Sequence, residues 1–183
     1  KIGTDAFYSC ISLESADLPD GVEEIENRAF AGARYMTSAR IPQSVHSMGE
    51  SVFSGCRSLE RMDIPGSIKT VPADTLFACA ALKELSIGSG IQTIGRRAFG
   101  GCTALESVRI PDGVTELDAM AFMGDGELVS AFIPESVKII GAEAFARCGK
   151  LREISLPGGI EDIGAAAFSG CAALAEKDGF VMI

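Results

Sequence analysis

The sequence of 183 residues has little of what enzymes and metalloproteins need. It contains a single histidine, His46, and this one base cannot activate six cysteines as nucleophiles. The cysteines are never closer than 23 residues, whereas zinc sites use close pairs such as C-x₂-C. No phosphate-binding loop and no carboxylate pair distinct from surface charge is present. We therefore expect no catalytic residue, no cofactor and no metal, and an enzyme is the weakest functional hypothesis.

Long hydrophobic runs and clusters of basic residues are missing as well. No apolar stretch approaches the roughly 18 residues of a membrane span, so we expect no membrane insertion. The chain has 16 basic and 25 acidic residues, and the basic ones are scattered, which argues against a nucleic-acid groove. The net charge of −9 favours solubility. Lys1, Ile2 and Gly3 lead into no apolar stretch of a secretory signal, and they begin inside a repeat.

What the sequence does have is a repeat of 23 residues that runs without insertion. Prolines and cysteines recur at multiples of this spacing, and Gly88 fills the one proline position that is skipped. One unit reads L-x-x-(I/V/M/L/A)-x-I-P-x-(G/S)-(V/I)-x-x-I-G-x-x-A-F-x-G-C-x-x. The column that defines it has eight members: Leu13, Met36, Leu59, Leu82, Leu105, Leu128, Leu151 and Leu174.

The unit from residue 105 to 127 shows how each repeat is expected to fold. Val108 and Ile110 alternate as in a strand, and Pro111 ends that strand because proline has no N–H to donate. Gly113 suits a turn, a second extended piece follows, and "AMAF" is long enough for about one helical turn. No unit can bury its apolar columns alone, so the units must stack. We predict a solenoid of about eight coils, with short parallel strands and one short helical turn in each 23-residue coil.

Two columns near the helical turn are interpreted as structural. The phenylalanines are expected to fill the interior as stacked rings: Phe7, Phe30, Phe53, Phe99, Phe122, Phe145 and Phe168. The cysteines follow a glycine-rich reversal and are interpreted as small buried hydrophobes in a reduced ladder: Cys10, Cys56, Cys79, Cys102, Cys148 and Cys171. Neighbouring thiols fall within the distance range of disulfides, but parallel side chains would not converge.

This repeat pattern resembles the BspA-type leucine-rich repeat, and the resemblance spans Ile2 to Leu174. It implies an α/β leucine-rich-repeat solenoid with a curved strand face. Members of that family are commonly bacterial or protozoan surface proteins, and several are associated with adhesion to host matrix proteins or to other microbes. The family shares no catalytic residues, so none is carried over to this chain.

Several positions depart from the pattern. Leu76 stands in the phenylalanine column with Phe77 one place later, and Pro72 replaces the usual glycine, which predicts a locally reshaped turn. Asp125 interrupts the cysteine column. After Leu174 the register fails. We therefore assign residues 1–174 to the solenoid and 175–183 to the start of an irregular segment that leads out of it, in what we expect to be a fragment of a longer protein.

One repeat carries a candidate contact for a partner. Val129 and Phe132 occupy strand positions that are polar or charged in other units, and alternation with Ala131 points Phe132 outward. Ile139 similarly replaces polar residues. An outward aromatic ring on a strand face suits a partner. Alternatively, a neighbouring coil, Arg109 stacked on the ring, or a missing domain covers it.

Two functional hypotheses remain beside the weak enzyme hypothesis. The first is a noncatalytic, adhesin-like protein-binding module displayed on a microbial surface, with host matrix or other surface proteins as partners. The second is a structural spacer or scaffold that presents another domain and has no ligand of its own. Extracellular placement is implied by the family resemblance, whereas six unpaired cysteines argue mildly against it.

Overall fold

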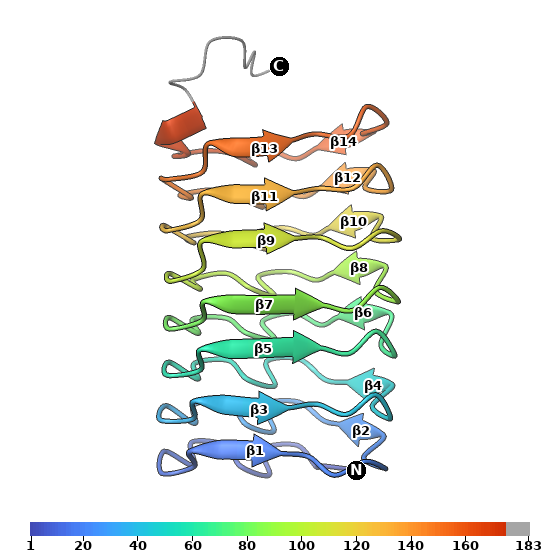
Figure 1. The fold of residues 1–183 in the computed structure, drawn as a ribbon, viewed down its shortest axis with the longest axis vertical. Helices are drawn as coiled ribbons and strands as arrows, with labels where there is room; N and C mark the ends of the chain where they lie inside the picture. The colour runs from blue at the N-terminus through green and yellow to red at the C-terminus, as the bar shows by residue number, and fades with distance from the viewer. Residues whose placement is uncertain (175–183) are drawn as a thin grey trace.

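The computed structural model of the chain describes residues 1–174, and the segment predicted at 175–183 lies outside this part. Coils of 23 residues stack along the long axis of the molecule, with the N-terminus at one end (Figure 1). The predicted solenoid with short parallel strands is thereby confirmed. Each coil has three sides, formed by a first strand, a second strand and a tight turn.

The first strand of each coil follows the leucine column and ends at the proline position, as the sequence predicts. Strand neighbours are parallel and offset by one repeat, for example Ala16 beside Ala39 and Val108 beside Ala131. The pairing order is β1-β3-β5-β7 and β9-β11-β13, with an interruption between β7 and β9. The bounds are β1 (Ser15–Asp17), β3 (Ser38–Arg40), β5 (Arg61–Ile64), β7 (Glu84–Ile87), β9 (Ser107–Arg109), β11 (Ser130–Phe132) and β13 (Glu153–Ser155).

The second strand is only two residues long in every coil. It begins after the Gly/Ser turn, and its second residue is apolar. This residue is buried in β2, β6, β8, β10 and β12, half-buried in β4 and exposed in β14. The pairing order is β2-β4 and β6-β8-β10-β12-β14, so this side is interrupted between β4 and β6. The bounds are β2 (Glu24–Ile25), β4 (Ser47–Met48), β6 (Thr70–Val71), β8 (Thr93–Ile94), β10 (Glu116–Leu117), β12 (Ile139–Ile140) and β14 (Asp162–Ile163).

The predicted helical turn is wrong in its detail: within residues 1–174 the one helical element is the 3₁₀ helix η1 (Ala172–Leu174). Two residues with positive φ flank each phenylalanine, such as Arg97 (52°) and Gly101 (75°) around Phe99. These left-handed residues prevent the backbone from continuing as a helix. Instead, alternate N–H groups donate to the next coil, as Phe99 does to Ala121 at 2.9 Å. The third side is therefore another ladder between coils.

The phenylalanine rings form the expected stack, which lies in the interior except at its ends, where Phe7 is exposed and Phe168 is half-buried. Successive ring centroids lie 5.1–5.5 Å apart, and the rings of Phe30, Phe53, Phe99, Phe122 and Phe145 are buried. Leu76 takes the interior place between Phe53 and Phe99, and it is also fully buried. Phe77 lies outside it, with the guanidinium of Arg97 5.0 Å from its ring centroid. The leucine substitution thus interrupts the aromatic stack but fills the core.

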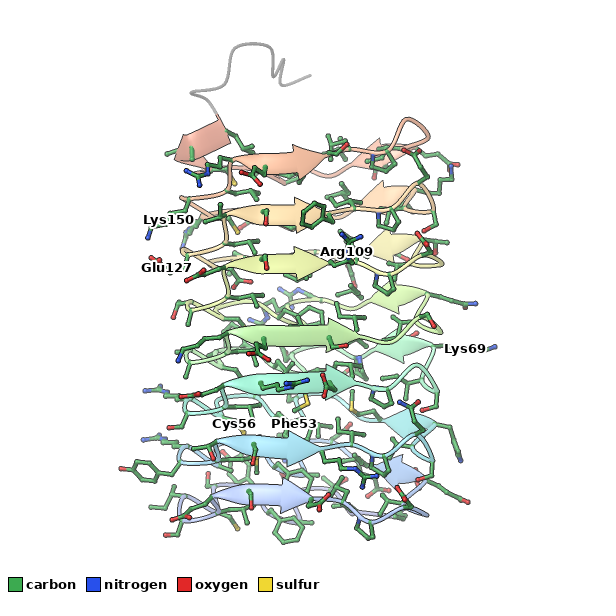
Figure 2. The ribbon with its side chains drawn as sticks, in the orientation of Figure 1. Phe53, Cys56, Lys69, Arg109, Glu127 and Lys150 are labelled. Atoms are coloured by element: carbon green, nitrogen blue, oxygen red, sulfur yellow. The ribbon has the colours of Figure 1, made fainter. Side chains whose placement is uncertain are left out.

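The cysteines have a role that the sequence interpretation missed. The thiols of Cys56, Cys79, Cys102, Cys148 and Cys171 are buried, and each donates to a backbone oxygen in the preceding coil at 3.0–3.4 Å. The prediction of burial is wrong for Cys10, which lies in the first coil and is exposed. The acceptor is always the residue of the phenylalanine column, for example Phe30 for Cys56 (Figure 2 labels Cys56 and Phe53). A thiol is therefore a small hydrophobe that also donates a weak hydrogen bond.

Candidate functional site

The face formed by the first strands carries the candidate contact. Phe132 is the last residue of β11, and it points outward with 48% of its surface exposed. The guanidinium carbon of Arg109 lies 4.8 Å from its ring centroid, within the range of a cation–π interaction. Figure 2 shows Arg109 on this face. Arg109 therefore fixes the ring from one side and leaves about half of it exposed.

A hollow of about 300 Å³ adjoins the Phe132 ring on the side away from Arg109. Its walls come from β11, β13 and η1: Ala131, Phe132, Arg152, Glu153, Ile154, Ser155 and Leu174. Ile154 and Leu174 belong to the hydrophobic core or pack against it, so they give the hollow an apolar bottom. Arg152 and Glu153 form a charged pair at its rim. We call Phe132, Arg109 and this hollow the Phe132 surface.

The other two predicted contact residues, Val129 and Ile139, lie at different places relative to the Phe132 surface. Val129 immediately precedes β11 in the same coil and is half-buried. Ile139 is exposed by 36%, but it begins β12 in the second ladder, on another side of the coil. Sequence reasoning grouped Ile139 with Phe132 because both replace polar residues. The fold brings only Phe132, Arg109 and the neighbouring hollow onto one surface.

Charges elsewhere on the strand face pair with one another between coils. Arg40 lies 3.5 Å from Asp17 and 2.8 Å from Asp20, and Arg61 lies 3.2 Å from Glu84. By contrast, no carboxylate of residues 1–174 lies within ion-pair distance of Arg109. Exposed pairs of this kind contribute little to stability, about 0–1 kcal/mol each. The strand face is therefore mostly self-neutralised, and the Arg109 charge is directed at an aromatic ring.

Cys56, Cys79 and Cys102 are poor candidates for nucleophilic chemistry. Burial raises the pKa of Cys56 to about 12, and it raises the pKa values of Cys79 and Cys102 well above that of a free thiol. Such groups stay protonated at neutral pH, and the thiolate is the reactive form. Within the described part of the chain, no three His, Cys, Asp or Glu side chains are arranged to hold a metal ion. None of the helices described there is long and apolar enough to cross a membrane.

Comparisons with known proteins agree with this geometry. The chain resembles a solved leucine-rich repeat protein from Bacteroides ovatus, with 32% identity and a TM-score of 0.82, over 87% of this chain and 44% of that chain. It resembles another from Eubacterium ventriosum, with 25% identity and a TM-score of 0.80, over 92% of this chain and 45% of that chain. It also resembles the leucine rich repeat protein of T. pallidum, with 29% identity and a TM-score of 0.84, over 90% of this chain and 79% of that chain. The chain thus spans less than half the length of the first two proteins. No curated protein matches it.

The family itself is shown by the sequence pattern as a whole. The model of the BspA type leucine rich repeat region, with six copies, matches residues 1–125 and 71–178. Together these ranges cover the whole solenoid, residues 1–174. The chain therefore belongs to the family of BspA type leucine rich repeat proteins.

Proposed function

We propose that this chain is a noncatalytic, adhesin-like protein-binding module displayed on a microbial cell surface. Its partners are host matrix proteins or other surface proteins, and the Phe132 surface makes the central contact. The observation that carries the proposal is the half-exposed Phe132 ring, held by Arg109 beside an apolar hollow. Aromatic residues and arginine are the side chains most enriched at the centres of protein interfaces.

The shape of the molecule supports recognition of a macromolecule. The first strands form an extended, regular face along the long axis (Figure 1), and residues that point out of such a face can vary without loss of the core. The charged pair Arg152 and Glu153, which lines the hollow beside Phe132, would form part of the polar rim of the contact. The Phe132 surface provides the apolar centre.

Binding of the purified chain to a panel of host matrix and plasma proteins at physiological salt tests this proposal. Phe132→Asp is the test variant, and Ser86→Asp is its control because residue 86 lies in the same outward column, two coils away. We expect saturable binding that Phe132→Asp weakens at least about tenfold and Ser86→Asp leaves unchanged. Circular dichroism of each variant checks that the fold is intact. Binding that survives Phe132→Asp would move the contact elsewhere.

The alternative function is a spacer or scaffold that presents another domain. The paired charges over most of the strand face favour it, since a self-neutralised surface attracts few partners. This alternative predicts no binding to any member of the panel by the isolated chain.

A further inference from the structure

The interruption between β4 and β6 has an identifiable cause. In other coils, the residue after the second strand donates its N–H to the preceding coil, as Gly95 does to Val71 at 2.9 Å and Gly141 does to Leu117 at 2.7 Å. Pro72 holds this position after β6 and has no N–H. The oxygen of Met48 therefore receives no bond from Pro72, and β4 and β6 do not pair. Figure 1 shows a wider interval between β4 and β6 than between β6 and β8.

Four backbone groups lose their partners at this break. In the intact ladder, one backbone oxygen accepts from two consecutive N–H groups. For example, the oxygen of Thr115 accepts from the N–H groups of Lys138 and Ile139. By the same register, the backbone oxygen of His46 should accept from the N–H groups of Lys69 and Thr70. None of these bonds forms, so the oxygens of His46 and Met48 and the N–H groups of Lys69 and Thr70 have no backbone partner within residues 1–174. Both edges of the break thus offer unsatisfied hydrogen-bonding groups.

A groove of about 800 Å³ occupies the break, within the range of ligand pockets, about 300–1,000 Å³. It is lined by β4, β6 and their flanking residues: Asn27, His46, Ser47, Met48, Gly49, Glu50, Ser67, Ile68, Lys69, Thr70 and Pro72. Ile68 is buried and Met48 is half-buried, so they provide apolar surface at the bottom. Acceptors of one edge and donors of the other therefore flank an apolar bottom. The break is short, because the same two coils are bonded again at the N–H of Ser51 and the oxygen of Ala73, 2.9 Å apart.

The charge of Lys69 at the rim of the groove favours a peptide of opposite charge. Lys69 projects outward from the side of the solenoid at the groove (Figure 2). No carboxylate of residues 1–174 forms an ion pair with it. His46 is its neighbour in the same column, and Glu23, at 4.0 Å, lies on the side of His46 away from the groove. Glu50 is the acidic residue in the lining. Lys69 gives the rim a cation that is free to pair with a carboxylate.

We propose that this groove binds an extended, acidic peptide segment of another protein, which lies along the opening between β4 and β6. The peptide donates its N–H groups to the oxygens of His46 and Met48 and accepts from the N–H groups of Lys69 and Thr70. One of its carboxylates pairs with Lys69. Main-chain hydrogen bonds give affinity and the side chains give selectivity, as in other modes of recognition of extended peptides. Pro72 is the residue that keeps the position open.

The test uses two fluorescein-labelled, capped hexapeptides, one of alternating Asp and Val and one of alternating Glu and Ile, titrated against the chain by fluorescence anisotropy. We expect saturable one-to-one binding of at least one of them. Pro72→Gly restores the missing N–H, and Lys69→Glu reverses the rim charge, so each should weaken binding by about tenfold or more. Lys138→Glu is the control because it changes the same column where the ladder is closed. Hydrogen exchange of the Lys69 and Thr70 amides should slow when the peptide is bound.

Several results would overturn the proposal. If neither peptide binds at millimolar concentration, the groove holds water only. Equal binding of peptides with N-methylated amides would exclude main-chain hydrogen bonding, and equal binding of a Lys/Val peptide would exclude the acidic preference. Binding that Pro72→Gly retains would place the peptide elsewhere. Phe132→Asp is expected to bind the peptide normally, so the outcome is independent of the function proposed for the Phe132 surface.

Discussion

Asp125 replaces a thiol in the buried cysteine column, and its carboxyl group is adapted to that position. Oδ1 accepts from the N–H of Cys102 at 2.9 Å, whereas Oδ2 is buried without a partner. In the other coils, the group at this position donates to an oxygen of the phenylalanine column, which is Phe99 for this coil. Burial raises the pKa of Asp125 well above its usual value. A protonated Oδ2 could donate to Phe99 as the thiols do for their neighbours.

The raised pKa predicts how Asp125 affects stability as pH changes. Below the usual pKa of aspartate, about 3.9, the group is protonated in both the folded and the unfolded chain. Above it, the unfolded chain loses the proton while the folded chain keeps it, so the free energy of unfolding decreases as pH rises towards the folded pKa. The loss is up to about 1.4 kcal/mol per pH unit.

We expect Asp125→Asn to remove this loss, because an amide can accept from Cys102 and donate to Phe99 without carrying charge. The variant should be more stable than the parent at pH 7 and nearly equal to it at pH 4. Urea denaturation at several pH values measures the difference. Asp112→Asn, which removes an exposed carboxylate in the same coil, is the control and should show no such divergence. Equal pH dependence of Asp125→Asn and the parent would mean that Asp125 is ionised in the fold.

A second feature at the residue scale is the set of residues other than glycine that adopt the left-handed backbone conformation. Ala78 has a φ of 60° in a column where other coils have glycine, for example Gly55 at 72°. A residue with a Cβ loses about 1–2 kcal/mol in this conformation, partly offset because glycine makes the unfolded chain more flexible. Ala78→Gly should therefore raise the free energy of unfolding by about 0.5–1 kcal/mol.

The reverse substitution is the matched control for Ala78. A Cβ built on Gly55 meets no atom closer than 3.9 Å, so Gly55→Ala introduces backbone strain without a clash. It should destabilise the chain by a similar amount in the same denaturation experiment. A loss of stability in both variants would show that packing, rather than φ, determines this position.

At the scale of elements, the ladders bring backbones into close contact at the glycines that follow four of the second strands, β4, β8, β12 and β14. A Cβ on Gly141 would lie 2.5 Å from the nitrogen of Ala119 and 2.6 Å from the carbonyl carbon of Asp118. Backbone atoms cannot move aside as a flexible side chain can. Gly141→Ala should therefore push two coils apart and cost about 1–3 kcal/mol.

Gly126→Ala is the control for that prediction, because a Cβ there has no neighbour within 4 Å. It should change the free energy of unfolding by no more than about 0.5 kcal/mol. Thermal denaturation of both variants measures the two effects side by side. A mild effect of Gly141→Ala would mean that the second ladder can separate without cost to the rest of the coil.

The elements also show which features the sequence could predict. The alternation of Val108 and Ile110 before Pro111 located the first strands, and alternation around Phe132 placed its ring outward, because both depend on the two-residue period of a strand. The third side was predicted as a helical turn because left-handed residues such as Arg97 carry no sequence signal. Pro72 was recognised as a departure, but its effect falls on strand pairing, since only the neighbouring coil shows which oxygen lacks a donor.

For the whole molecule, each coil contacts only its neighbours, so stability depends on successive interfaces between coils. Two interfaces have an incomplete ladder: the first strands do not pair between β7 and β9, and the second strands do not pair between β4 and β6. At both places the third side remains bonded, for example Phe53 to Thr75 at 2.9 Å and Phe99 to Ala121 at 2.9 Å. The stack therefore stays continuous, but it is locally weaker at these interfaces.

Hydrogen exchange should detect this unevenness in the absence of any ligand. Lys69 and Lys138 are the same residue type in the same column, and only the Lys138 amide has a backbone acceptor, Thr115 at 2.8 Å. Exchange reports local opening, and an amide without an acceptor needs no opening to exchange. We expect the Lys69 amide to exchange at least about a hundredfold faster than the Lys138 amide at neutral pH. In Pro72→Gly, where the ladder can close, the two rates should approach each other. Equal rates in the parent chain would mean that β4 and β6 pair in solution, and the groove between them would then be closed in the free protein.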